Sequence, residues 1–120
     1  MREDLELGDA ALILEGIFGT GLARDVRDPY RRAILAVNAL GESGIPIVSI
    51  DVPSGLDANS GAVLGVAIKA TLTATMAAPK VGFGKEQGPA HVGEVVVIDL
   101  GAPPALLERV RAPHPPPTRD

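Results

Sequence analysis

The sequence predicts a single α/β domain with a mainly parallel sheet. Two short apolar runs, 47–50 and 93–100, predict strands. The first is bounded by turn residues and is typical of a strand that is buried on both faces, as in parallel sheets. A helical pattern connects the first of these runs to an earlier one, 11–17, and a short strand–helix–strand connection makes its two strands parallel. Aromatic residues make up only 2% of the 120-residue chain, so we expect a core of Val, Ile, Leu and Ala.

The first strand and the first helix follow directly from local signals. Residues 11–17 carry a lone acid, Glu15, close to the end of the predicted strand, and its simplest role is that of an edge carboxylate facing solvent. A glycine-rich turn, 18–25, comes next. Asp28 and Pro29 then predict the start of a helix, because Asp accepts bonds from free amides and proline suits the first helical position.

The helix has one apolar face and a glycine-rich end. Five residues share this face at helical spacing: Tyr30, Ala33, Ile34, Val37 and Leu40. Gly41 and Gly44 are expected to end the helix, because glycine tolerates the left-handed cap conformation. The strand 47–50 then ends at Asp51, which enters a Pro-Ser-Gly turn containing Ser54.

The second half of the chain is less regular. Turn-forming residues occupy 56–61, and the stretch 63–70 fits either a short helical turn or an extended link. Alternating hydroxyl and apolar residues predict a third strand over 71–76, and 93–100 is the fourth. We expect 79–89 to be a loop, because it contains several glycines and prolines. Pro103 or Pro104 begins a short helix, and a proline-rich, disordered tail or linker follows over 111–120.

Composition narrows the classes of function. The net charge is −4 and basic residues are scattered, so nucleic acid is not an expected partner. No apolar stretch reaches the roughly 18 residues that span a bilayer, and the start of the chain lacks a signal-peptide core, so we expect no membrane partner and a cytoplasmic location. The absence of cysteine excludes thiolate nucleophiles and disulfides.

Polar side chains gather where two predicted strands end. Ligand sites in open α/β sheets lie at the carboxyl ends of the strands, which is where Glu15 and Asp51 fall. Two acids placed together repel unless a proton or a cation lies between them, and Ser54 adds a further oxygen for a hard cation. The alternative is that Asp51 and Ser54 only cap their own turn through local hydrogen bonds.

Weaker signals surround this predicted site. Gly19 and Gly21, with Arg24, are placed to bind a phosphate, although the third glycine of the dinucleotide fingerprint is absent. His91 is interpreted as a loop residue and not as a metal ligand. Lys80 and Lys85 are expected to be solvated, unless their loop folds over the strand ends.

Several motifs in order along the chain resemble the YjeF N-terminal domain family, the NAD(P)H-hydrate epimerases. The stretches are 15–22, 50–57 with its Asp-Val-Pro-Ser-Gly-Leu-Asp sequence, 69–75, 78–80 and 93–101. The resemblance implies a Rossmann-like three-layer α/β fold. It also implies interconversion of the R and S epimers at the hydrated C6 of NADHX or NADPHX, so that a partner dehydratase can repair the nucleotide.

The resemblance also implies roles for particular residues. A potassium ion would be held by Glu15, where the family usually has aspartate, and by Ser54. Asp51 would be the catalytic residue, acting as a polar anchor or as an acid/base near the nicotinamide ring. The hydrate would be bound by Asp51 and by the segment Gly19, Thr20, Gly21, Leu22, Ala23, Arg24 and Asp25.

One part of the family pattern is not found in the sequence. The resemblance implies an N-terminal half with an Asn-Asn-Gly-Gly-Asp phosphate loop, and we find no such motif here. We therefore expect 1–110 to be a partial epimerase domain that pairs with itself as a homo-oligomer or with a complementing N-terminal half. The alternative is a catalytically inactive, truncated fragment that acts only as a nucleotide- or protein-binding module.

Overall fold

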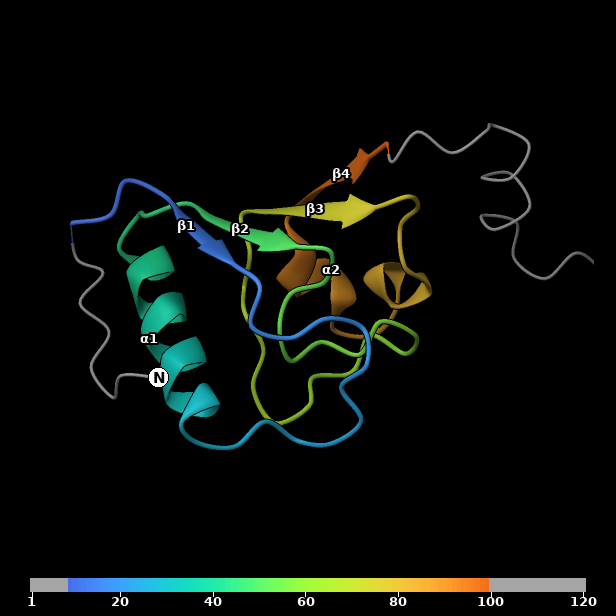
Figure 1. Cartoon of the computed structure of the whole chain (residues 1–120), viewed down its shortest axis with the longest axis horizontal. Helices are drawn as coiled ribbons and strands as arrows, with labels where there is room; N and C mark the ends of the chain where they lie inside the picture. Colours follow the sequence, from blue (N-terminus) through green and yellow to red (C-terminus); the bar gives the residue numbers. More distant parts are fainter. Residues whose placement is uncertain (1–8, 100–120) are drawn as a thin grey trace, which may run out of the picture.

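The computed structural model describes residues 9–99, which contain a four-stranded sheet with helices packed on it (Figure 1). The strands are β1 (Ile13–Glu15), β2 (Ile47–Ile50), β3 (Leu72–Met76) and β4 (Glu94–Ile98). They lie in the order β1-β2-β3-β4 and every neighbouring pair is parallel. The predicted α/β class and parallel sheet are therefore confirmed.

Helix α1 (Tyr30–Glu42) packs its apolar face against the sheet. Ala33, Ile34 and Val37 are buried, and the last two belong to one core cluster with Ile13 of β1 and Ile47 of β2. The predicted apolar face of the helix is thus confirmed at Ala33, Ile34 and Val37. Tyr30, at the first position of the helix, is exposed and instead stacks edge-on against the ring of Phe18.

Both predicted ends of α1 differ in detail. Pro29 occupies the cap position without a side-chain hydrogen bond, so the expected capping role of Asp28 is wrong; the Asp28 carboxylate lies 3.9 Å from Arg32 at the surface. At the other end the helix continues through Gly41 to Glu42, because Gly41 packs directly against Ile47. Gly44 has a φ of +109° and is the glycine that reverses the chain, as predicted.

The region 79–89 is not the plain loop that its glycines and prolines predicted. It contains a 3₁₀ helix, η1 (Val81–Gly84), and the start of a short helix, α2 (Gly88–Val92). Pro89 falls in the first turn of α2, where the missing amide costs no hydrogen bond. Phe83 and Val92 are buried together and anchor both pieces, so tertiary packing decides the local structure here.

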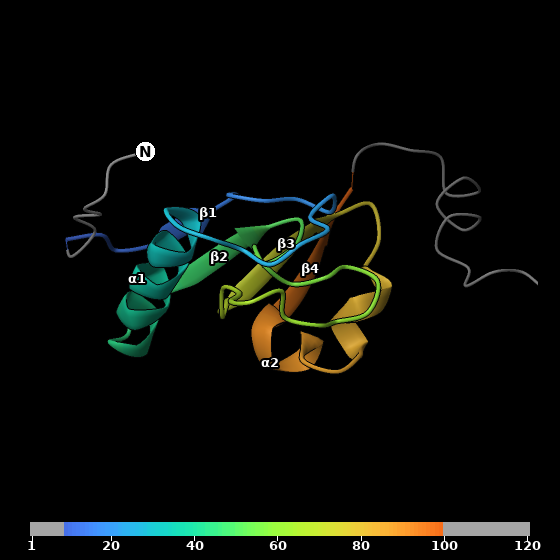
Figure 2. The ribbon, with the colours of Figure 1, turned by 90° about the horizontal axis from the view of Figure 1, so that it is seen from below.

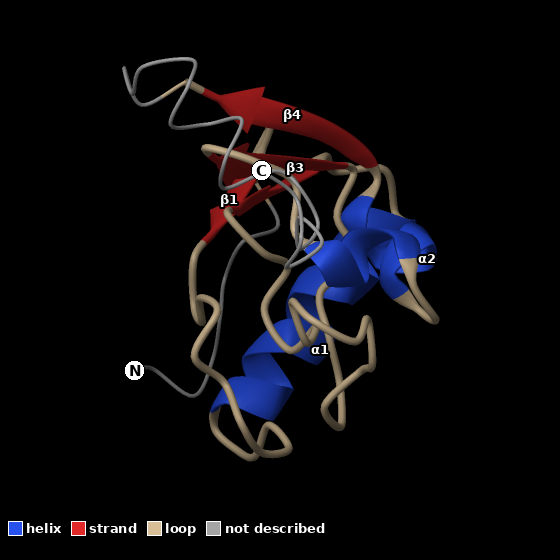
Figure 3. Ribbon diagram, turned by 90° about the vertical axis from the view of Figure 1, so that its right-hand side faces the viewer, coloured by secondary structure: helices blue, strands red, loops and turns tan. Residues whose placement is uncertain are grey.

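Helices α1 and α2 lie on the same face of the sheet (Figures 2 and 3). On the opposite face several apolar side chains of the described residues are exposed, with Leu14 66% and Ile50 36% exposed. The expectation that the strand 47–50 is buried on both faces is therefore wrong within the described part: Ile47 and Ser49 are buried, whereas Ile50 is not. The described residues give the sheet and one helical layer of the predicted three-layer arrangement.

Some sequence-based expectations fall on other parts of the chain. The helix beginning at Pro103 or Pro104 and the tail 111–120 lie outside the described residues. The stretch 63–70 is an extended link without a helical turn, and Val63 forms an isolated bridge to Leu56. No helix between residues 9 and 99 is long and apolar enough to cross a membrane.

Candidate functional site

The carboxyl ends of β1, β2 and β3 converge on one edge of the sheet (Figure 1). Glu15 is the last residue of β1, and Asp51 directly follows β2, which pairs with β1 in parallel. The two acids thus lie at the ends of neighbouring strands, as predicted from the order of the elements. Their surroundings, however, are very different.

Glu15 is buried, with only 4% of the residue exposed, and its carboxylate is surrounded by hydrogen-bond donors. Oε1 accepts bonds from the Ser54 hydroxyl and, at 3.3 Å, from the Ile17 amide; Oε2 accepts bonds from the Ser49 hydroxyl and, at 3.0 Å, from the Ser54 amide. The interpretation of Glu15 as an edge carboxylate facing solvent is therefore wrong. Parallel pairing places Glu15 beside Ser49 on the helix-covered face, so the side chain points into the protein.

Ser54 is buried and connects two segments that are far apart in sequence. Its hydroxyl lies 2.5 Å from Oε1 of Glu15, and it accepts a bond of 2.8 Å from the Phe18 amide. The alternative that Ser54 only caps its own turn is wrong, since these partners lie 36 or more residues away. The conformation of the turn also requires Gly55, which has a φ of +94° and whose Cβ would lie 2.0 Å from the Val66 carbonyl oxygen.

The oxygen atoms around Ser54 are of the kind that a hard cation binds. A carboxylate, a hydroxyl and the Phe18 carbonyl, 3.3 Å from the Ser54 hydroxyl, are the oxygen ligands that hard cations prefer. No group of three or more acidic, histidine or cysteine side chains converges within the described part of the chain. A cation bound here would therefore rest on mixed oxygens, and it would share those of Glu15 with the hydrogen bonds described above.

The backbone of Asp51 turns sharply at the end of β2. Its φ is +69°, in the left-handed region that non-glycine residues rarely adopt, and its amide donates to the Ala74 carbonyl of β3 over 2.8 Å. Residues held in such conformations concentrate at functional sites. The turn directs the Asp51 side chain toward the end of β3.

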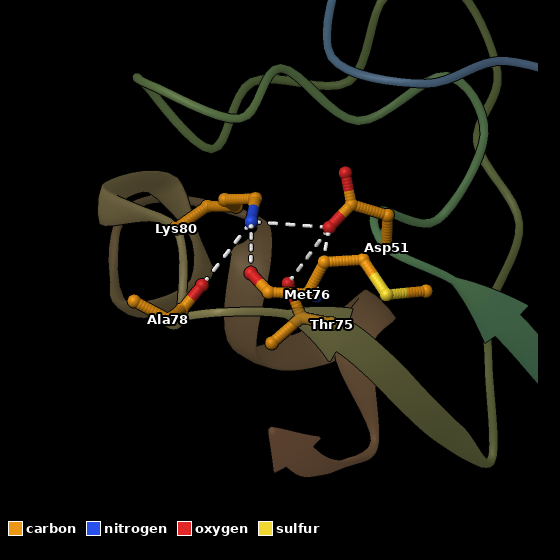
Figure 4. Close-up of polar contacts among 5 residues, drawn as sticks. All are labelled: Asp51, Thr75, Met76, Ala78 and Lys80. Carbon is orange, nitrogen blue, oxygen red and sulfur yellow. Dashed lines mark hydrogen bonds and ion pairs between the residues drawn. The ribbon is translucent and has the colours of Figure 1, made fainter. Parts of the chain in front are cut away.

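The Asp51 carboxylate is held by one of its two oxygens (Figure 4). Oδ1 accepts bonds from the Thr75 hydroxyl at 3.1 Å and the Met76 amide at 3.0 Å, and it lies 3.0 Å from the Lys80 ammonium. Oδ2 has no such partner among the described residues. Burial raises the pKa of Asp51, but the Met76 amide, the Lys80 ammonium and the Thr75 hydroxyl outweigh it and hold the pKa below its ordinary value of 3.8.

Lys80 lies at the candidate site, although its position in a predicted loop led us to expect a solvated side chain. Its ammonium contacts the Met76 carbonyl at 3.0 Å, the Ala78 carbonyl at 3.1 Å and Asp51. The segment after β3 folds over the strand ends. This is the exception that the sequence allowed for Lys80. Its partner there is the carboxylate of Asp51. Lys85, by contrast, is exposed as expected.

The segment proposed to bind substrate, 19–25, is the exposed chain that follows β1. Phe18 ties its beginning to Ser54, and Val26 anchors its end through a 2.9 Å amide bond to the Leu64 carbonyl. No atom lies within 4 Å of a Cβ built on Gly19 or Gly21, so this backbone borders open space. In Figure 4 a blue ribbon, the colour of the early part of the chain, runs above Asp51 in the view. Because Phe18 is bound to Ser54, three residues beyond Asp51, the segment begins at the same sheet edge as Asp51.

Two further polar residues, His91 and Asp57, have hydrogen-bond partners of their own, and none of these partners is Asp51. His91 is a buried residue of α2, not a loop residue, and its Nδ1 lies 2.9 Å from the Gln87 carbonyl. Asp57 closes its own turn: its Oδ1 accepts the Asn59 and Ser60 amides at 2.8 and 2.9 Å. These two amides, Ser60 first, lower the pKa of Asp57.

A parallel α/β sheet with helices packed on one face is consistent with a Rossmann-like fold, and polar side chains and an open glycine-rich segment lie at its carboxyl edge. Residues 1–82 match the model of the family described as YjeF-related protein N-terminus, and the chain belongs to this family.

Curated relatives agree with this assignment. The chain is 47% identical over 114 residues to the bifunctional NAD(P)H-hydrate repair enzyme Nnr of Salinibacter ruber, covering 89% of this chain and 20% of the relative. It is 46% identical to the NAD(P)H-hydrate epimerase of Limosilactobacillus fermentum, with 78% of this chain and 43% of the relative aligned. The corresponding epimerase of Levilactobacillus brevis is 45% identical, with 80% and 43% aligned. The chain thus spans less than half the length of these relatives.

Proposed function

We propose that the chain acts in NAD(P)H-hydrate epimerisation, interconverting the R and S forms of NADHX or NADPHX. The observation that carries the proposal is the convergence of Asp51 and the open segment 19–25 at the carboxyl edge of a parallel sheet. Both lie within the part of the chain that matches the family. Relatives that are 45–47% identical are named for this activity or for NAD(P)H-hydrate repair.

In this proposal the residues at the carboxyl edge of the sheet have three different roles. Asp51 is the catalytic residue, because its Oδ2 is a carboxylate oxygen without a partner among the described residues, and the lowered pKa of Asp51 favours its charged form. Backbone amides between Gly19 and Asp25 bind the phosphate or ribose of the nucleotide. Glu15 and Ser54 hold a potassium ion, which would supply positive charge beside the bound nucleotide.

The activity is tested by incubating the purified chain with R-hydrate and following S-hydrate by chromatography, in potassium and in sodium buffers. The expected result is conversion faster than the spontaneous reaction, and faster in potassium. The exposed-lysine variant Lys85→Met serves as a matched control and should keep the rate. Saturable binding of the hydrate with no rate above the spontaneous one would favour a binding module and contradict the enzyme proposal.

We also propose that the bare sheet face pairs with another polypeptide surface, either in a homo-oligomer or with a complementing N-terminal half. Parallel sheets are normally covered on both faces, whereas Leu14, Ile50, Val96 and Ile98 are exposed on this one. A groove of about 350 Å³ also runs along β1, the edge strand. The term bifunctional in the names of longer relatives supports a functional link to the dehydratase that completes repair.

Light scattering across a range of concentrations tests the self-association. The average mass of the chain should rise with concentration, and Leu14→Glu on the bare face should lower it. Leu35→Glu is the matched control, since Leu35 is 43% exposed on α1. A monomeric mass at every concentration would contradict a homo-oligomer; complex formation with a separately added N-terminal half of an epimerase relative would then support the other pairing.

A further inference from the structure

We propose that Lys80 is a positioning residue for Asp51: it holds Oδ1 and thereby leaves Oδ2 to meet the substrate. This inference rests on the function proposed above for Asp51. It assigns to Lys80 a role at the reaction centre in which the lysine touches neither the nicotinamide ring nor a phosphate.

The Lys80 ammonium has no free donor for a ligand. An ammonium carries three hydrogens, and three acceptors surround this one: Asp51 Oδ1 at 3.0 Å, the Met76 carbonyl at 3.0 Å and the Ala78 carbonyl at 3.1 Å. A phosphate could bind here only by displacing one of them. The lysine therefore acts on the site through the groups that it already holds (Figure 4).

The contacts of Asp51 are strongly asymmetric. Three donors, from Thr75, Met76 and Lys80, all meet Oδ1, and the described residues leave Oδ2 without a partner. Thr75 and Met76 belong to β3, whereas Lys80 comes from the following segment. Lys80 also fixes the Met76 and Ala78 carbonyls, so the same ammonium sets both the strand end and the carboxylate orientation.

The charge of Lys80 is suited to this task. Its ammonium is the cationic group within 4.0 Å of Asp51 in the described part of the chain, and both side chains are largely shielded, with 22% and 26% exposed. Partial burial weakens solvent screening, so the pair acts more strongly than a surface ion pair. Removing the positive charge should therefore alter both the orientation and the ionisation of Asp51.

The test compares Lys80→Met, which keeps the length and removes the charge, with Lys80→Arg, which keeps the charge. The pKa of Asp51 is measured by ¹³C carboxyl NMR on the full chain. We expect a higher Asp51 pKa in Lys80→Met and a value near that of the parent in Lys80→Arg. The carboxyl of Asp57 is an internal control, because its pKa is set by the Ser60 and Asn59 amides and should not move.

A lysine that only fastens its own loop would give a different result. Lys80→Met would then lower the melting temperature and leave the Asp51 carboxyl pKa unchanged, which would overturn the proposal. Lys85→Met, at an exposed lysine of the same region, should change neither quantity. If Lys80→Met does not fold, the pKa of Asp51 in Lys80→Gln decides between the two roles.

Kinetics then separate this inference from the proposed function. If the parent chain converts the hydrate, Lys80→Met should lower kcat by about tenfold or more with a smaller change in KM, because misplaced catalytic groups cost rate. Lys80→Arg should recover part of the loss. An unchanged kcat in Lys80→Met would overturn the positioning role. If the parent chain shows no conversion, the proposed function fails, and the NMR result still decides whether Lys80 controls Asp51.

Discussion

The two carboxylates at the ends of β1 and β2 have opposite environments. Glu15 is buried and accepts hydrogen bonds on both oxygens, from Ser49, from Ser54 and from the Ile17 amide. Asp51 is half-buried, accepts bonds on Oδ1 alone and adopts a left-handed backbone conformation. The fold thus places two acids at the ends of neighbouring strands. Glu15 has a framework role, which means that its carboxylate holds several segments of the fold together.

The difference teaches what each carboxylate can do. A carboxylate with every acceptor position near a donor stabilises the segments that supply those donors, and for Glu15 these are β1, β2 and the Ser54 turn. A carboxylate with one fixed and one open oxygen is oriented but still free to bind a ligand. We therefore expect substitutions at Glu15 to act on stability first, and substitutions at Asp51 to act on function first.

The largest effect is expected for Glu15→Ala. Four donors would lose their acceptor and a cavity would form, so the free energy of unfolding should fall by about 3 to 5 kcal/mol in urea titrations. The matched variant Glu15→Gln keeps the volume and one acceptor oxygen, and it should lose less. A loss below about 1 kcal/mol in Glu15→Ala would contradict the framework role.

A smaller loss is expected for Ser54→Ala. The Glu15 carboxylate and the Phe18 amide would each lose a buried partner, which should cost about 2 kcal/mol in urea titrations. Ser43→Ala removes an exposed hydroxyl that bonds to the Leu40 carbonyl and is the control for the substitution itself.

Ser54→Ala also tests the potassium proposal. Replacing sodium by potassium should raise the melting temperature of the parent chain but not that of Ser54→Ala, since a ligand stabilises the state that binds it. Equal melting temperatures of the parent chain in the two salts would contradict a potassium site that includes Ser54.

The sequence was sufficient to place both acids but not to separate them. Apolar runs and the parallel rule put Glu15 and Asp51 at one sheet edge. Whether an acid at a strand end points inward depends on register, and only the pairing of Glu15 with Ser49 shows that it faces the helices. A serine within an apolar run gave no signal of its own, so Ser49 was missed.

The contact between Lys80 and Asp51 and the helix α2 were missed for a different reason. Local composition indicated a loop, but buried Phe83 and Val92 fold 79–89 back against the sheet, and that path brings Lys80 to Asp51. Such contacts depend on packing between distant segments, which periodicity does not report. The stretch 78–80, which belongs to the family resemblance, was the available signal. The apolar run 47–50 likewise could not show that the described structure covers only one of its faces.

For Asp51→Asn we expect the opposite of Glu15→Ala: a small loss of stability and a large loss of activity. The amide oxygen can still accept from Met76 and Thr75, so only the charge that pairs with Lys80 is lost, and the free energy of unfolding should fall by about 1 to 2 kcal/mol, less than in Glu15→Ala. Epimerase activity should fall by about 100-fold or more, because the charged oxygen is gone. Asp57→Asn should leave the rate unchanged, because the Asp57 carboxylate accepts hydrogen bonds within its own turn. A stability loss as large as that of Glu15→Ala would erase the contrast between the two acids.

The smallest effect concerns the pH dependence of stability. The folded-state pKa of Asp51 lies below the ordinary 3.8, so its stabilising contribution is complete above that value and is lost as the pH falls through the folded pKa. Melting temperatures recorded from about pH 6 to about pH 3 should therefore fall less steeply in Asp51→Asn than in the parent chain. Asp57→Asn should reduce the slope independently, because its pKa is also lowered but by its own turn. An unchanged slope in Asp51→Asn would show that Met76 and Lys80 hold the Asp51 carboxyl without favouring its charged form.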